Sequence, residues 1–245
     1  MKVLVTGATG YAGRGLTEVL AAVHAVRGFD VRPGELQGAE VMTGDLASLD
    51  DCRRAAAGME AAVLCHMAPN PTGYQTPVQA MDVNVKGTAN LYHALVEAGV
   101  RKVVLISSGG VLLKTPGADA VIGAGPYNFN NGLYVLTKIM QEQIARFYFE
   151  TQAVCTAVLR PGWVVYDESF VTKYGQKLEQ YHSTLMDPRD IGQAVALALA
   201  LPDLKLESFN LEQEGGPAYD NRLTRSRLGW SPRYTFSSLK KNPNP

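Results

Sequence analysis

The chain has 245 residues, 46% of them hydrophobic, which is enough to bury the core of one large domain or of one domain with a small lobe. Its 23 acidic and 23 basic residues balance, so nothing in the charge favours binding of nucleic acid or of an anionic membrane. No apolar run reaches the roughly 20 residues of a membrane span, and the cysteines and histidines lack the spacing of metal ligands. We therefore expect a cytoplasmic protein without a metal site, whose partner is a small molecule.

Strand and helix signals alternate along the whole chain. Short apolar and β-branched runs predict strands over 2–7, 24–30, 39–45, 61–66, 102–108, 153–160 and 207–212. Helical spacing of apolar residues predicts helices over 13–23, 49–58, 77–98, 131–150, 188–201 and, with a turn, 221–230. This alternation predicts an α/β fold with a Rossmann-type, doubly wound parallel sheet, which binds ligands at the carboxyl ends of its strands.

Two predicted connections are longer than the others, residues 67–77 and 109–130. The second is rich in glycine and too long for a simple link between two elements. Its length favours a flap over a binding site.

The first predicted strand is followed by the glycine-rich stretch TGATGYAG, which also contains Thr9, Tyr11 and Ala12. Gly7, Gly10 and Gly13 fit the three needs of a dinucleotide site: a tight turn, close approach of the backbone to a pyrophosphate, and close packing of helix on strand. The start of the helix then offers free N–H groups and the positive end of its dipole to the phosphates. The alternative is a glycine-rich turn that binds nothing.

Asp30 ends the second strand, 17 residues after Gly13, where a carboxylate can bind the two hydroxyls of the adenosine ribose. The same charge would repel a 2′-phosphate, so we expect NAD rather than NADP. Arg32 leaves NADP open, because arginine can hold that phosphate. Asp45, followed by Leu46, ends the third strand and either reaches the adenine or serves as a turn or helix-cap residue.

Further motifs occur in order on the expected elements: AAVLCHMA, NVKGTANL, ISSGGV, a tyrosine and a lysine four residues apart, and LRPGWVV. Together with the glycine loop they resemble the extended short-chain dehydrogenase/reductases, the NAD-dependent epimerase/dehydratase group. The likeness covers residues 1 to about 165, weakens over 166–186, and returns in DPRDIGQAVALAL, FNLE and RLGWSPRY.

The resemblance implies a division of the chain. Residues 1–165 would form the NAD-binding Rossmann domain, completed by parts of 187–211. Residues 166–186 and 212–245 would form a small substrate-binding lobe.

The resemblance also implies catalytic residues. Tyr134 would be the acid/base, Lys138 its partner one helical turn away, and Ser108 the hydroxyl that orients the substrate, while Asn84 would hold a water that connects Lys138 to solvent or else bond helix backbone. A lysine cation lowers the pKa of a nearby phenol and so makes it a usable base. Because side chains alternate along a strand, only one of the adjacent Ser107 and Ser108 can face the site.

Other residues would line the cofactor and the substrate, with simple packing as the alternative. The cofactor candidates are Met67, Ala68, Ile106, Pro161, Gly162 and Val164, and the substrate candidates beside Ser108 and Tyr134 are Gly109 and Trp163.

The sequence departs from the family in ways that narrow the function. Gly109 and Gly110 stand where sugar-nucleotide dehydratases carry an acidic pair, so dehydration is not expected. Only 26 residues separate Trp163 from Arg189, too few for the nucleotide-binding lobe of the nucleotide-sugar epimerases. This compact layout resembles the uronate dehydrogenases, although those place Asn-His after the serine. A substrate carboxylate would then need another partner.

The lead hypothesis is an NAD-dependent oxidoreductase that oxidises a hydroxyl of a small sugar, sugar acid or polyol. Lys173, Lys177 and Arg189 are candidate partners for a carboxylate, with an ordinary surface charge as the favoured alternative for each one. The alternatives are an epimerase that keeps its NAD, an NADPH-dependent carbonyl reductase and a redox-sensing binding module. The resemblance also implies a homodimer formed through the helices at 77–98 and 131–150.

Overall fold

A computed structural model of the chain describes residues 1–71, 73–112, 127–214, 216 and 218–241. The strands in it are β1 (Lys2–Thr6), β2 (Ala25–Asp30), β3 (Ala39–Thr43), β4 (Ala61–Leu64), β5 (Lys102–Ile106), β6 (Cys155–Pro161), β7 (Trp163–Val164), β8 (Gln180–Tyr181), β9 (Leu185–Met186), β10 (Leu206–Leu211) and β11 (Lys240–Lys241). The α-helices are α1 (Tyr11–Ala21), α2 (Leu49–Ala56), α3 (Pro77–Ala80), α4 (Gly87–Glu97), α5 (Gly132–Gln152) and α6 (Pro188–Ala200). Short 3-10 or π turns lie at Met81–Lys86, Gly109–Val111, Phe129–Asn131 and Thr224–Leu228. Most of the predicted flap over 109–130 lies outside the described residues.

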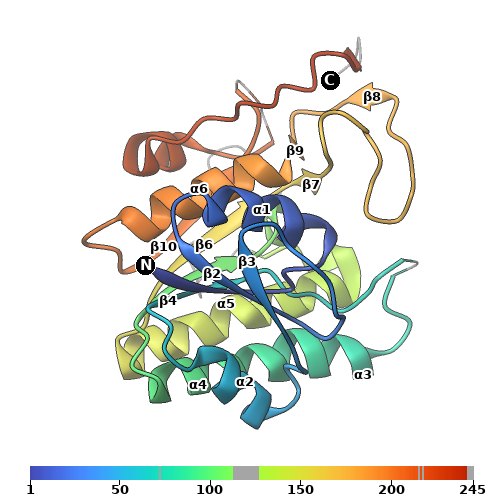
Figure 1. Cartoon of the computed structure of the whole chain (residues 1–245). Helices are drawn as coiled ribbons and strands as arrows, with labels where there is room; N and C mark the ends of the chain where they lie inside the picture. The colour runs from blue at the N-terminus through green and yellow to red at the C-terminus, as the bar shows by residue number, and fades with distance from the viewer. Residues whose placement is uncertain (72, 113–126, 215, 217, 242–245) are drawn as a thin grey trace.

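Seven strands form one parallel sheet in the order β10-β6-β5-β4-β1-β2-β3, which confirms the predicted fold class (Figure 1). The chain runs outward from β1 through β2 to β3 and then crosses back to β4 on the other side of β1. Such a reversal opens a crevice at the carboxyl ends of the strands, where ligands bind in this class of sheet.

Helices cover both faces of the sheet (Figure 1). Helices α1 and α6 pack on one face, where Leu16 and Val195 lie fully buried in a common apolar cluster with Val5 of β1. Helices α2, α4 and α5 pack on the other face, where Leu91 and Leu105 belong to a second cluster. Because both faces are buried, the central strands consist of continuous apolar runs rather than alternating ones.

The helix predicted over 77–98 contains a π-helical segment, Met81–Lys86, between α3 and α4. Asn84 lies in this π-helical segment, and its side chain points inward and is fully buried. Such segments occur often at functional sites, because they re-aim single side chains within a helix.

The helices predicted to form a dimer interface expose less apolar surface than their sequences suggest. Leu91 and Tyr92 are fully buried in the core because α4 lies between α2 and α5, and the Tyr148 ring stacks on Tyr92 with the centroids 5.2 Å apart. Phe147 of α5 and Val78 of α3 do reach the surface and are 58% and 66% exposed.

The segments after β6 and β10 gather beyond the main sheet (top of Figure 1). They contain the two-stranded sheets β7-β9 and β8-β11. A small apolar cluster of their own holds them together; its buried members are Val165, Leu178, Leu185, Phe236 and Leu239.

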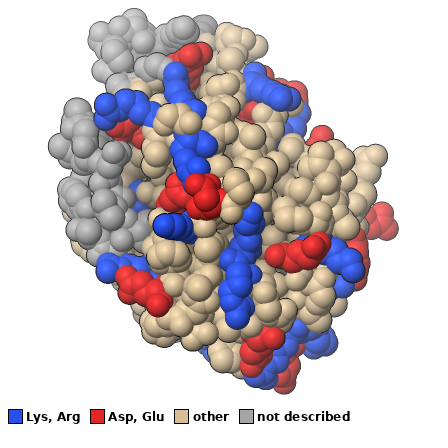
Figure 2. All heavy atoms as spheres, turned by 90° about the vertical axis from the view of Figure 1, so that its left-hand side faces the viewer, with Lys and Arg blue, Asp and Glu red and all other residues tan. Residues whose placement is uncertain are grey.

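On the face presented in Figure 2, acidic and basic side chains lie close to one another instead of gathering by sign. Oppositely charged side chains also form ion pairs in the structure, such as Arg227 with Glu207. Within the described part of the chain, no helix has both the length and the apolar character that crossing a membrane requires.

Candidate active site

The glycine loop connects β1 to α1 at the carboxyl edge of the sheet. Gly7 adopts a φ of +67°, a left-handed conformation that favours glycine, and its amide donates to the carbonyl of Phe29 at 2.9 Å. Gly10 precedes α1, and no side chain among the described residues caps that end of the helix. The first amides of α1 are therefore available to an anion.

Two polar groups beside this loop suit a dinucleotide. The hydroxyl of Thr9 is buried, and within the described residues it has no hydrogen-bond partner. The carboxylate of Asp30, also buried, accepts hydrogen bonds from the amides of Thr9 at 3.2 Å and Arg32 at 3.1 Å. The Arg32 side chain is exposed, with its Nε 3.7 Å from Asp30. The glycine loop, the hydroxyl of Thr9 and the carboxylate of Asp30 together fit the pyrophosphate and ribose of a dinucleotide.

Asp45 lies further from this arrangement. Its carboxylate accepts a hydrogen bond from the amide of Ala47 at 2.8 Å, which is the turn role left open by the sequence. Leu46 is buried and packs against Gly87, the first residue of α4.

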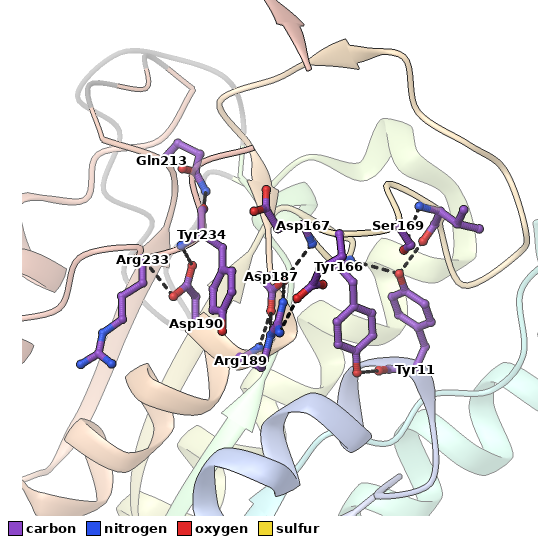
Figure 3. A network of polar contacts seen from close by, with 12 residues as sticks. Tyr11, Tyr166, Asp167, Ser169, Asp187, Arg189, Asp190, Gln213, Arg233 and Tyr234 are labelled. Carbon is purple, nitrogen blue, oxygen red and sulfur yellow. Dashed lines mark hydrogen bonds and ion pairs between the residues drawn. The ribbon is translucent and has the colours of Figure 1, made fainter. Parts of the chain in front are cut away.

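Tyr11, predicted to line the cofactor, directs its side chain toward a later segment of the chain. Its hydroxyl donates to the carbonyl of Val171 and accepts from the amide of Tyr166 at 3.2 Å, while its ring meets that of Tyr166 edge-on (Figure 3). The side chain therefore connects the glycine loop to the segment after β7. Tyr11 and Ala12 are the first two residues of α1.

The three predicted catalytic residues meet at the carboxyl end of β5. The hydroxyl of Ser108 lies close enough to the phenol of Tyr134 to lower its pKa, against the larger effect of burial. Lys138, one turn along α5, is buried, and its ammonium donates to the carbonyl of Ile106 at 2.9 Å. Ser107 points the other way and donates to Glu142 at 2.6 Å, as the alternation of side chains requires.

Burial changes the pKa values of Tyr134 and Lys138. It raises the pKa of Tyr134, while the nearby hydroxyl of Ser108 lowers it. Burial also lowers the pKa of Lys138 to about 8; the ammonium of Lys173 adds to that effect, and the carboxylate of Glu142 opposes it. At neutral pH the phenol is therefore protonated and the lysine remains mostly a cation.

Asn84 connects three elements around this group. Its carbonyl accepts from the amide of Ala68 at 2.8 Å, and its amide donates to Thr137 of α5 at 3.0 Å and to Tyr74 at 3.3 Å. The partner of its carbonyl is thus loop backbone rather than the helix backbone that the sequence left open. The side chain fixes the start of the loop after β4, where Met67 and Ala68 lie.

The residues predicted to line the cofactor after β6 follow the edge of the sheet. Pro161 ends β6, Gly162 has no space for a side chain next to Thr184, and Val164 belongs to β7. Trp163 is 57% exposed, with its ring 6.4 Å from that of His182.

Three features were not predicted. Under the catalytic helix, Glu142 forms a fully buried ion pair with Arg160 at 2.7 Å. Glu142 is four residues after Lys138 and Arg160 is a charge in an apolar strand, and these two signals together could have revealed the pair.

His66 is the second feature. It is buried between the hydroxyls of Thr6 at 2.8 Å and Thr88 at 3.0 Å. Its burial, together with the charge of Lys138, lowers its pKa to about 3, so the ring is neutral. The third feature is Tyr219, which packs in one apolar cluster with Tyr134.

Arg189, a candidate partner for a carboxylate, is held in a separate network at the start of α6 (Figure 3). Its guanidinium pairs with Asp187 at 2.7 Å and with Glu168 at 2.6 Å, and it lies over the ring of Tyr234. Within the described residues, no group of three or more His, Cys, Asp and Glu side chains could hold a metal ion.

Comparison with known proteins identifies relatives of the chain. The sequence pattern of the NAD dependent epimerase/dehydratase family matches residues 3–180. The 3-beta-hydroxysteroid dehydrogenase of Mycolicibacterium neoaurum is 33% identical over 175 residues, which are 66% of this chain and 47% of that protein. The chain thus spans about half the length of the curated steroid dehydrogenases that it matches.

Two other similar proteins cover the chain more fully. The L-arabinose 1-dehydrogenase (NAD(P)(+)) of Haloferax volcanii is 26% identical over 249 residues, which are 95% of this chain and 96% of that protein. A variant of the uronate dehydrogenase from Agrobacterium tumefaciens, solved in complex with NAD, has the same fold, with a TM-score of 0.79 and 24% identity over 100% of this chain and 91% of that one.

Proposed function

The chain belongs to the NAD dependent epimerase/dehydratase family, and from that membership we propose that it is an oxidoreductase that uses NAD to oxidise a hydroxyl of a small sugar, sugar acid or polyol. One observation carries the proposal. A buried lysine cation, Lys138, lies one helical turn from Tyr134, whose pKa is raised by burial and lowered by the nearby hydroxyl of Ser108, at the sheet edge that also carries the glycine loop.

NAD, when bound, supplies the acceptor for the hydride that leaves the alcohol carbon. The uncapped start of α1 would hold its pyrophosphate, Thr9 would supply a hydroxyl, and Asp30 would bind the adenosine ribose. Met67, Pro161 and the carbonyl edge of β5 would line its other end.

The proton of the alcohol would go to the phenolate form of Tyr134, which the neutral phenol reaches only after it has released its own proton. Since burial raises the pKa of this phenol, the phenolate needs a nearby positive charge, and we propose that the ammonium of Lys138, one helical turn away, supplies it. Ser108 donates a hydrogen bond to the substrate oxygen and so stabilises the charge that develops there. Asn84 keeps the loop at Ala68 in place beside these groups.

A compact substrate is supported by the size of the lobe after β6. We propose that this lobe, residues 166–186 and 212–245, binds the substrate beside the Rossmann domain formed by residues 1–165 and parts of 187–211. The full-length similarity to an L-arabinose dehydrogenase favours a single sugar ring. The similarity to steroid dehydrogenases covers about half of those proteins and supports the shared mechanism more than the substrate.

If the substrate is a sugar acid, Lys173 is the best partner for its carboxylate. The residue is exposed, but its ammonium lies 3.5 Å from the sulfur of Met67, and partial desolvation lowers its pKa. Arg189 is already paired with Asp187 and Glu168. Lys173→Met should therefore raise the KM for a uronate about tenfold while leaving that for a neutral sugar unchanged, whereas Lys177→Met, at another exposed residue, should change neither. Equal effects of the two variants on the KM for the uronate would reject Lys173 as the partner of the substrate carboxylate.

The alternatives predict different measurements. An epimerase would retain NAD through purification and form no net NADH. A carbonyl reductase that prefers NADPH would bind that cofactor through Arg32, although the proximity of Asp30 to Arg32 counts against it. A redox-sensing module would bind the nucleotide without turnover.

The test is a panel of pentoses, hexoses, uronates and polyols with NAD, followed by NADH absorbance. Tyr134→Phe should lower kcat at least about a hundredfold and leave NAD binding unchanged, because it removes only the proton acceptor. Tyr148→Phe, whose hydroxyl contacts the carbonyl of Ala89 far from the site, is the matched control. Unchanged turnover in Tyr134→Phe would reject the catalytic assignment.

We also propose a homodimer formed through helices 77–98 and 131–150. The exposed side chains of Val78 and Phe147 support this interface. Light scattering should give the mass of two chains for the wild type and of one chain for Phe147→Glu; a monomeric wild type would contradict the proposal.

A further inference from the structure

Gly109 directly follows Ser108, and the space beside it is filled from a distant part of the chain. A methyl group on Gly109 would lie 2.6 Å from the ring carbon Cζ of Tyr219 and 2.7 Å from its hydroxyl oxygen. Carbon atoms in proteins do not approach so closely without overlap, so a side chain at residue 109 fits only if the tyrosine ring moves away. The Tyr219 ring thus fills the space that a side chain of residue 109 would take, beside Ser108.

The same ring packs against the apolar cluster that also contacts the proposed catalytic tyrosine. Tyr219 and Tyr134 both pack against one apolar cluster, whose buried members are Val111, Leu112, Val135 and Ile139. Burial raises the pKa of the Tyr219 phenol and the nearby carboxylate of Glu212 adds to that effect, so its hydroxyl stays protonated and can both donate and accept a hydrogen bond. An apolar ring face and a neutral hydroxyl therefore stand next to the reacting group.

A buried carboxylate holds this tyrosine in place. Glu212, fully buried just after β10, accepts hydrogen bonds from the amides of Tyr219 at 2.7 Å and Ala218 at 3.0 Å, and from the hydroxyl of Ser183 at 2.7 Å. Hydrogen bonds to an ionised carboxylate are among the stronger ones in proteins. Glu212 therefore fixes the backbone of Tyr219 and joins it to Ser183 in the segment after β8.

We propose that Tyr219 is a specificity-determining residue, which forms one wall of the substrate pocket and restricts it to compact, hydroxyl-rich rings. This inference rests on the proposed function. The ring face can pack against the C–H groups of a sugar ring and the phenol can bond one of its hydroxyls. The absence of a side chain at Gly109 and Gly110 leaves this wall to the lobe, which would explain how the site recognises a substrate without polar residues directly after Ser108.

The experiment measures kcat and KM with NAD for L-arabinose, D-galactose, D-galacturonate and a 3β-hydroxysteroid. Tyr219→Ala should raise the KM of the best sugar about tenfold, and change kcat much less, because the ring binds the substrate but takes no part in the proton transfer. Tyr219→Phe should raise the KM by a smaller factor, because only the hydroxyl bond is lost. NAD affinity should remain within about twofold in each variant, since Tyr219 lies outside the proposed cofactor site.

A double-mutant cycle tests the contact itself. Gly109→Ala should lower kcat/KM at least about tenfold, because the methyl group displaces the ring, and adding Tyr219→Ala should restore part of that loss. Thermal unfolding of all four proteins checks that each is folded, and Tyr219→Phe preserves the test if Tyr219→Ala does not fold. A purely structural Tyr219 would change the melting temperature without the tenfold change in KM.

The outcomes separate this inference from the function on which it rests. Turnover by the wild type with unchanged KM in both Tyr219 variants would overturn the inference alone. A higher kcat/KM for the steroid than for every sugar would overturn the restriction to compact rings. A wild type that forms no NADH with any compound would overturn the proposed function and the inference with it.

Discussion

At the scale of single residues, His66 has a strong consequence for stability. The imidazole is buried against Thr6 and Thr88. Its pKa in the folded protein is about 3, so the ring stays neutral at any pH above that value. In the unfolded chain the same group takes up a proton below its ordinary pKa of 6.5. Between these values the unfolded state binds more protons, so the free energy of unfolding falls as the pH falls through this window.

We expect the free energy of unfolding of the wild type to drop by up to about 1.4 kcal/mol for each pH unit below 6.5, beyond the drop seen for His66→Gln. Denaturant unfolding at pH 7.5, 6 and 5 measures the difference. His93→Gln, at an exposed histidine on α4, is the control and should retain the wild-type slope. Parallel pH profiles for the wild type and His66→Gln would contradict the buried neutral imidazole.

Asp30 carries the second prediction at this scale. Its carboxylate lies at the end of β2 with Arg32 beside it, and its charge opposes the 2′-phosphate of NADP. Asp30→Ser should shift the ratio of kcat/KM values toward NADP at least about tenfold, because the repulsion is removed while the arginine remains. Initial rates with both nucleotides measure the shift. Asp45→Ser removes a carboxylate that bonds only a turn and should leave the ratio unchanged.

At the scale of elements, helix α5 is fastened to the sheet by a buried charge network. Glu142 bonds Arg160 of β6 through both carboxylate oxygens, at 2.9 and 2.7 Å, and also accepts from Ser107. The helix that carries Tyr134 and Lys138 is therefore held against two strands at once. Its position relative to β5 decides where the phenol lies.

Removing one partner of this pair leaves a buried charge without compensation. Arg160→Met should therefore lower the free energy of unfolding by about 3–5 kcal/mol, as should Glu142→Leu. The double variant should be more stable than either single one, because neither charge remains buried. Denaturant titrations of the four proteins test this, and additive losses would show that the two charges act independently. The exposed pair of Arg146 and Glu150 on the same helix is the control, and its variants should change stability by less than about 1 kcal/mol.

The elements themselves could be predicted well from the sequence, because each depends on neighbours along the chain. Periodicity located the strands of the sheet, and the glycine loop and the spacing of Tyr134 and Lys138 are local patterns. The interruption at Met81–Lys86 could not be predicted, since it depends on Asn84 finding partners in another loop and in α5. The burial of Tyr92 could not be predicted either, because it depends on which helices cover α4 and not on neighbouring residues in the sequence.

At the scale of the whole molecule, the segment after β7 is attached to the glycine loop through Tyr11. Its hydroxyl bonds Val171 and Tyr166, and the Tyr166 hydroxyl returns a bond to the carbonyl of Tyr11 at 3.3 Å. Beyond Tyr166, the guanidinium of Arg189 connects to the end of the chain through the ring of Tyr234 (Figure 3). The glycine loop and the segment after β7 are thus connected by hydrogen bonds through Tyr11 and Tyr166.

Tyr11→Phe should weaken NAD binding about tenfold and make the segment around Val171 easier to cleave by a protease, because two hydrogen bonds to that segment are lost. Calorimetric titration with NAD and limited proteolysis measure the two effects. Tyr148→Phe is again the control, since its hydroxyl bonds α4 on the other face of the sheet. Unchanged NAD affinity and cleavage in Tyr11→Phe would contradict the link.

The close approach of Gly109 to Tyr219 also limits how this sequence can diverge. A side chain at residue 109 overlaps the ring, so a descendant that acquires one has to displace the ring or carry a smaller residue at 219. The order in which residue 219 becomes smaller first avoids the cost of an overpacked intermediate. The two positions are thus epistatic, and among homologues a residue larger than glycine at 109 should occur together with a small residue at 219.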